Sequence, residues 1–212
     1  MPRLCPPLPF HGPTEPNEFL LGRLILPTGQ LVACDPVTRL EEARPFERRV
    51  APGTYAVRLG ALEGDAAYVA VLVGEGAVVH WEAARFSGAD EDGFYVDAST
   101  AAFMDLAGVA ALRRRPSPDP FTRLLDAGYR ERPHAVVDLG GGGNLVAFGT
   151  GTDGRFSSYW GLDERGAPVV LVTDLGVLRA SHTELRAAPE PPPPPPPSMG
   201  AKILPFPSRK KS

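Results

Sequence analysis

The chain has 212 residues, of which 43% are apolar and 22% are charged, a composition typical of a soluble globular protein with a core of ordinary size. No run of roughly eighteen apolar residues occurs, so no membrane-spanning segment is expected. The net charge of −3 is unevenly distributed, because the residues after Ser198 carry +4 and the rest of the chain −7. An acidic body argues against a nucleic-acid partner, which would need clustered Lys and Arg.

The first 18 residues contain six prolines and no periodicity, which predicts an extended N-terminal arm. Prolines interrupt the segment where a secretory signal peptide needs an apolar helix, so a cytoplasmic protein is expected. The two cysteines, Cys5 and Cys34, cannot form a disulfide framework and are interpreted as inert thiols.

The next segments alternate between apolar runs and turn signals. Runs at 19–25 and 30–34 flank Pro27-Thr-Gly29, a pattern that predicts a hairpin. Residues 54–59 alternate as a half-buried strand does, and 67–74 are typical of a buried central strand. The range 99–115 has apolar residues at helical spacing before Pro116, which predicts a long helix, and 119–129 predicts a second, short one.

The last part of the chain is rich in strand and turn signals and then in proline. Three β-rich runs within Asn144–Leu178 predict a three-stranded meander. The unbroken prolines Pro191–Pro197 predict polyproline II, either a spacer or a ligand for an aromatic groove. The sequence therefore predicts an α+β fold, mainly antiparallel sheet as a sandwich or strongly curved sheet, with one or two helices around 99–128. Its expected organisation is an arm at 1–18, one globular domain at 19–187 and a disordered tail at 188–212.

Five aspartates lie at predicted strand ends or turns, namely Asp35, Asp97, Asp153, Asp163 and Asp174. Converging carboxylates bind hard cations such as calcium or magnesium, or supply an acid and a base. Isolated aspartates instead cap turns by accepting backbone N–H bonds. Capping is the favoured interpretation, because Thr152-Asp-Gly154 and Asp163-Glu-Arg-Gly166 are ordinary turn sequences. No cofactor is therefore expected, and a divalent cation at these acids is the alternative.

Aromatic residues supply the other binding candidates. Tyr159 and Trp160 are neighbours in a predicted strand, so one is expected to face the core and the other to face outward, where Trp81 could join it. An exposed aromatic near acids suits a sugar or peptide groove, while burial of both tryptophans in the core is the more frequent outcome. The candidate binding residues are Trp81, Asp153, Tyr159, Trp160, Asp163 and Asp174. No nucleophile motif occurs, so no catalytic constellation is predicted.

Several short motifs occur together in an order that resembles the bacterial DUF4241 family. They are Gly29-Gln-Leu-Val-Ala-Cys-Asp-Pro36, Pro52-Gly-Thr-Tyr-Ala-Val57, Phe94-Tyr-Val-Asp97, Gly151-Thr-Asp-Gly-Arg-Phe156 with Tyr159-Trp-Gly161, and Leu171-Val-Thr-Asp-Leu175. The resemblance covers roughly residues 20–180 and departs from the family pattern at Thr152 and Leu175. It implies no particular activity.

The leading hypothesis is a non-catalytic, cytoplasmic binding or interaction module with an acidic surface. One version is an immunity-like protein that neutralises a basic toxin domain through charge complementarity. The alternative is a metal-assisted hydrolase that uses Asp97, Asp153 and Asp174. A further possibility is that the proline tail docks in an aromatic groove of a partner.

Overall fold

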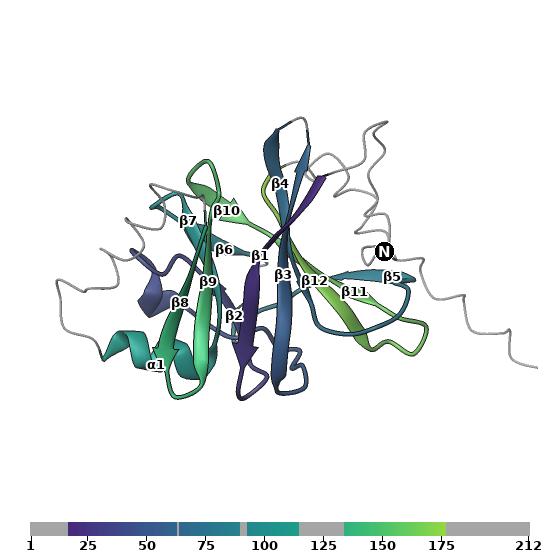
Figure 1. Ribbon diagram of the computed structural model, residues 1–212, viewed down its shortest axis with the longest axis horizontal. Helices are drawn as coiled ribbons and strands as arrows, with labels where there is room; N and C mark the ends of the chain where they lie inside the picture. Colours follow the sequence, from purple (N-terminus) through teal and green to yellow (C-terminus); the bar gives the residue numbers. More distant parts are fainter. Residues whose placement is uncertain (1–16, 63, 90–92, 115–133, 177–212) are drawn as a thin grey trace, which may run out of the picture.

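The computed structural model describes residues 17–62, 64–89, 93–114 and 134–176, which form two main antiparallel sheets (Figure 1). The six-stranded sheet has the order β1 (Asn17–Leu26), β3 (Gly53–Leu62), β4 (Asp65–Leu72), β12 (Pro168–Asp174), β11 (Ser158–Leu162) and β5 (His80–Ala83). The four-stranded sheet has the order β2 (Leu31–Cys34), β7 (Thr100–Asp105), β9 (Gly143–Gly149) and β8 (His134–Gly140). β6 (Phe94–Val96) pairs separately with β10 (Gly154–Phe156).

The main core lies between the two sheets. Val57 and Leu171 of the six-stranded sheet and Phe103 and Val146 of the four-stranded sheet belong to one buried cluster. The other face of the four-stranded sheet packs against the single described α-helix, α1 (Leu106–Arg113), and a 3-10 turn, η1 (Leu40–Glu42). Figure 1 shows α1 beside β8, far from β11 and β5. The predicted α+β class, dominated by antiparallel sheet, is confirmed.

The strands predicted at 54–59 and 67–74 are confirmed as β3 and β4. β4 lies between β3 and β12, and β4 and β12 are buried along nearly their whole length. Their continuous apolar runs follow from burial on both faces, where β-branched side chains pack well. Among the residues that the structure describes, no helix is long and apolar enough to cross a membrane.

The hairpin predicted around Pro27-Thr-Gly29 is wrong. β1 pairs with β3, and β2 pairs with β7, so the two runs lie in different sheets. The turn between them is a corner at which the chain passes from one sheet to the other. It is stabilised by the Thr28 N–H and hydroxyl, which donate to the Asp105 carboxylate at 2.9 and 2.8 Å. Two apolar runs separated by turn residues occur both in a hairpin and at a corner between sheets, so this local pattern cannot distinguish them.

The three-stranded meander within Asn144–Leu178 is only partly confirmed. β11 and β12 pair as predicted, but β9 belongs to the four-stranded sheet and β10 pairs with β6. The chain passes from one sheet to the other between β9 and β11. This segment therefore connects the layers rather than forming one ribbon.

The helix predicted over 99–115 begins only at Leu106, because residues 100–105 form β7. Asp105 caps α1 by accepting a 2.9 Å hydrogen bond from the Ala107 N–H. β7 lies between β2 and β9 and all six of its residues are buried, so its unbroken apolar run imitated helical spacing. The second helix, predicted at 119–129, lies outside the described residues, as do most of the arm and the whole tail.

Asn144 joins the two sheets by completing the edge of β1. Its Oδ1 accepts from the Ile25 N–H at 2.7 Å, and its Nδ2 donates to the Arg23 carbonyl at 2.7 Å. Gly22 allows the close approach, because a Cβ there would lie 2.5 Å from Cγ2 of Val136. The amide of Asn144 thus takes the place of a neighbouring strand at this point.

Replacing Asn144 by alanine is expected to lower the free energy of unfolding by about 1–3 kcal/mol, because both backbone groups of β1 lose their partner. Native-state hydrogen exchange should show selective loss of protection at the Ile25 amide. Asn17→Ala, at the exposed start of the same strand, is the matched control and should change stability by less than about 0.5 kcal/mol. Unchanged protection at Ile25 would contradict this role.

Candidate functional site

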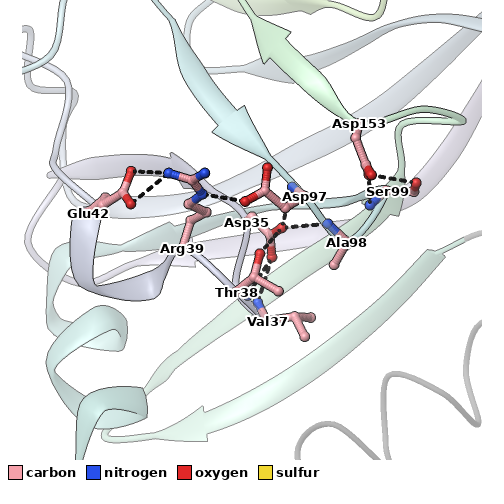
Figure 2. A network of polar contacts seen from close by, with 9 residues as sticks. All are labelled: Asp35, Val37, Thr38, Arg39, Glu42, Asp97, Ala98, Ser99 and Asp153. Carbon is pink, nitrogen blue, oxygen red and sulfur yellow. Dashed lines mark hydrogen bonds and ion pairs between the residues drawn. The ribbon is translucent and has the colours of Figure 1, made fainter.

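Asp35 is the centre of a polar network that fixes two loops (Figure 2). Asp35 is fully buried and directly follows the last residue of β2. Its carboxylate accepts backbone N–H bonds from Val37 and Thr38 at 2.8 and 2.9 Å and the Thr38 hydroxyl at 2.6 Å. The N–H groups of Asp97 and Ala98 also donate to it, both at 2.9 Å. One side chain therefore holds the turn before η1 against the loop after β6.

These hydrogen bonds keep Asp35 charged. Burial by itself raises the pKa of the carboxyl, but the hydrogen bonds from Thr38, Asp97 and Val37 outweigh it and lower the pKa below its ordinary value of 3.8. Burial, and after it the Asp35 charge, raises the pKa of the neighbouring Cys34 thiol to about 12. Cys34 is therefore a protonated, free thiol at neutral pH.

Arg39 lies one turn beyond Asp35 and is held by two acids. Its Nε donates to Asp97 at 2.6 Å, and its Nη1 donates to Glu42 at 2.8 Å. The guanidinium lies 5.8 Å from the ring centroid of Tyr95, and that of Arg155 lies 6.0 Å from the same ring. Tyr95 is 44% exposed, so two cations flank an aromatic ring that also faces solvent.

Asp153 fixes the same loop from the side of β10. Its Oδ1 accepts from the Ser99 N–H at 2.8 Å and the Ser99 hydroxyl at 2.9 Å. Ser99 has a φ of 48°, and among the described residues it is the one non-glycine with positive φ. Strained backbone of this kind persists only where surrounding contacts over-determine it and is frequent at binding sites. The loop at 97–99 is thus clamped between Asp35 and Asp153.

Comparing two substitutions at Ser99 should isolate this strain. Ser99→Gly and Ser99→Ala both remove the hydroxyl, but only glycine adopts positive φ without steric cost. The glycine variant is therefore expected to be the more stable by about 1 kcal/mol in urea unfolding. Equal stabilities, or a more stable alanine variant, would show that the backbone here is not strained.

A cleft of about 410 Å³ opens beside this network. Its apolar walls come from Ala33, Cys34, Ala43, Phe86, Ala89 and Phe94, and its polar lining from Arg39, Glu42, Arg44 and Tyr95. Phe86 stacks on Phe46 with ring centroids 4.3 Å apart, which anchors one wall in the main core. Arg44 is oriented by donating to the Gly88 carbonyl. The volume falls within the range of small-ligand sites.

None of the three predicted binding aspartates, Asp153, Asp163 and Asp174, lines the cleft. Asp163 accepts from the N–H groups of Arg165 and Ala167, and Asp174 accepts from that of Gly176, as the capping interpretation predicts. Across 17–62, 64–89, 93–114 and 134–176, no three His, Cys, Asp or Glu side chains are grouped so that they could hold a metal ion. The three aspartates of the predicted hydrolase site have separate partners. The Asp97 carboxylate accepts from Arg39, the Asp153 carboxylate accepts from Ser99, and Asp174 is the last residue of β12.

The expected outward-facing aromatic of β11 is wrong. Trp160 is 1% exposed in the main core, 5.9 Å from Phe46 between ring centroids, and Tyr159 is 7% exposed. The side chains of Tyr159 and Trp160 lie on opposite faces of β11. The face that carries Tyr159 is also covered, by a buried cluster around Tyr68, Val170 and Val172. Trp81 is half-buried and packs against that cluster. None of the three lines the cleft.

Sequence reasoning missed Arg39, Arg44 and Tyr95. The segment 38–49 is rich in charged residues and contains no recognisable motif, so the sequence does not show that Arg39 and Arg44 lie near Asp35 and Tyr95 in space. The one usable signal was β6, where Tyr95 alternates with the buried Phe94 and Val96 and so faces outward. In a short strand, an aromatic residue between two buried apolar residues lies on the surface side of the strand.

Comparison with known proteins gives one result. The family model DUF4241, described as a protein of unknown function, matches residues 24–173, which include Asp35, Tyr95, Asp97 and Asp153. No curated protein and no solved structure matches the chain. Because the match covers more than half of the 212 residues, the chain belongs to the DUF4241 family.

Proposed function

We propose that the protein is a non-catalytic, cytoplasmic binding module whose recognition site is the cleft beside Tyr95. The observation that carries this proposal is the cleft itself, an apolar hollow with a charged and aromatic rim held by a buried carboxylate. A site fixed in advance loses little conformational entropy when it binds. The protonated thiol of Cys34 supplies no nucleophile, which favours binding over covalent chemistry.

Tyr95 is the proposed anchor. Tyrosine is enriched among the residues that dominate binding energy, because it offers a large contact area with few rotatable bonds. The guanidiniums of Arg39 and Arg155 both lie over the Tyr95 ring, and Arg39 is itself bonded to Asp97 and Glu42. The ring is therefore oriented before a partner arrives.

The favoured partner is a protein with a basic surface. The residues before the tail carry a net charge of −6. Glu42 lines the cleft, and the exposed Glu41 and Asp97 lie on the segments beside it, where the three acids pair with Arg39 and Arg113. A net acidic body raises association rates with basic partners and disfavours acidic ones. An immunity-like protein that neutralises a basic toxin domain has this chemistry.

A cleft-filling variant tests the proposal. Ala89→Trp places a large side chain at the rim of the cleft, so affinity capture from native cells should lose the partner that the wild-type chain retains. Val79→Trp, at an exposed apolar position outside the cleft lining, is the control and should retain it. Capture that is equal in both variants would contradict the assignment. Calorimetric heat with magnesium or calcium that is lost in Asp153→Ala would instead support the metal-assisted hydrolase with Asp97, Asp153 and Asp174.

The prolines Pro191–Pro197 carry a separate proposal, that this run is itself a ligand for an aromatic groove in a partner. Removing residues 189–212 then loses one partner while the cleft-dependent partner is kept. Unchanged capture of all partners by the shortened chain would dispose of this role for the tail.

A further inference from the structure

The first four residues of β1, Asn17–Leu20, form a strand edge that carries two exposed apolar side chains, Phe19 and Leu20. β1 is the terminal strand of the six-stranded sheet. Leu20 is 61% exposed and Phe19 is 54% exposed, on opposite faces of the strand. Exposed, apolar edge strands pair readily with another strand unless charge, proline or a covering segment prevents it.

Alternate residues of this segment direct their backbone N–H and C=O groups away from β3. Further along β1, Arg23 and Ile25 direct their backbone groups outward, to Asn144, and they lie opposite Ala56 and Thr54. Along an antiparallel ladder, hydrogen-bonded pairs alternate with non-hydrogen-bonded pairs. The residues of β1 opposite Arg58 and Gly60 therefore also direct their backbone N–H and C=O groups away from β3. These residues are Leu20 and Glu18. Their N–H and C=O groups can receive a further strand.

The edges of β2 and β5 are protected. Along β2, Val32 forms a bridge to Pro45 and the Phe46 N–H donates to the Leu31 carbonyl. β5 has only four residues, and its Glu82 is paired with Arg48. Among the described residues, no segment covers the start of β1 in this way, and the carboxylate of Glu18 turns back to the Tyr68 hydroxyl and to Arg58.

We infer that this edge pairs with the same edge of a second copy of the chain. Antiparallel pairing about a two-fold axis at Phe19 places Phe19 opposite its own copy and Leu20 opposite Glu18. An aromatic pair directly across two strands is favourable, and no like charges meet because Glu18 is already bonded within its own chain. The segment is short, so the dimer is reversible and depends on concentration. This inference is independent of the cleft.

A cysteine at the two-fold axis tests the inference. In the full chain carrying Cys5→Ser, Phe19→Cys should give a disulfide-linked dimer on mild oxidation. Opposed residues of a non-bonded pair have Cα atoms about 4.5 Å apart, within the range that a disulfide spans. The remaining Cys34 is buried and protonated, so it does not compete. Val79→Cys, at an equally exposed apolar site, should stay monomeric.

Sedimentation of the chain with residue 19 intact gives the second measurement. The weight-average mass should rise with concentration, and Phe19→Glu should hold it at the monomer value because two carboxylates then oppose each other. Far-UV circular dichroism checks that this variant remains folded. A concentration-independent monomer mass, or equal crosslinking of Phe19→Cys and Val79→Cys, overturns the inference.

Discussion

Replacing Asp35 by alanine is expected to lower the free energy of unfolding by about 3–5 kcal/mol, a loss typical of broken buried networks. The substitution removes the acceptor of four backbone N–H groups and one hydroxyl, donated by Val37, Thr38, Asp97 and Ala98. Two of these donors lie more than 60 residues away from Asp35, so the loops on both sides of the cleft are released together. Urea unfolding with a constant denaturant slope measures the effect.

Asp163→Ala is the matched control. Asp163 also accepts two backbone N–H bonds, but in an exposed turn between β11 and β12. Water replaces those bonds when the carboxylate is removed, so the loss should be about 0.5–1.5 kcal/mol. Equal effects at Asp35 and Asp163 would mean that the buried network is not what stabilises the loops.

The contribution of Asp35 also depends on pH in a defined direction. Its pKa in the folded chain is below that of an unfolded chain, which is about 3.9. The unfolded chain therefore binds the proton first, and the stabilisation is fully present above about pH 4 and is lost as pH falls through the folded pKa. The stability difference between wild type and Asp35→Asn should be constant from pH 7 to 5 and should shrink below pH 4. A difference that persists at low pH would contradict a charged Asp35.

Replacing Tyr95 by alanine is expected to weaken partner binding by about 30-fold or more, equivalent to about 2 kcal/mol. The ring is the exposed aromatic of the cleft rim and is flanked by two guanidiniums that lose their packing surface with it. Because Tyr95 is 44% exposed, the free energy of unfolding should change by only about 1 kcal/mol or less. Biolayer interferometry with the captured partner should show the change mainly in the dissociation rate.

Val79→Ala is the control for that measurement. Val79 is exposed and apolar like Tyr95 but does not line the cleft. It should leave affinity and stability unchanged. Equal affinity of the Tyr95→Ala and Val79→Ala variants for the partner would remove Tyr95 from the recognition surface.

Local patterns in the sequence predicted the elements whose environment is simple. The alternating run in β3 and the continuous run in β4 were recognisable, and Asp163 caps a turn as its turn sequence indicates. β7 was mistaken for helix, because a strand buried on both faces loses the period of two that distinguishes it. One of Tyr159 and Trp160 was expected to face outward, because the sequence does not reveal that a second apolar cluster covers the other face of β11.

The candidate site was harder to predict, because its determinants are distant in the chain. Asp35 was visible as an acid at a strand end, but its bonds to Asp97 and Ala98 depend on how β2 and β6 meet. Arg39 and Tyr95 come from different segments and form no motif. Sequence patterns describe neighbours along the chain, whereas this site is made by contacts between segments about 60 residues apart.

Photo-crosslinking from position 95 tests the central claim, that the cleft is a binding site, most directly. A photoreactive phenylalanine analogue preserves the aromatic ring at Tyr95, and the same analogue at Val79 serves as the reference. Irradiation in native cells should give a discrete partner adduct from position 95, absent from position 79 and absent when Ala89→Trp fills the cleft. No adduct from position 95, or the same adduct from both positions, would contradict the account.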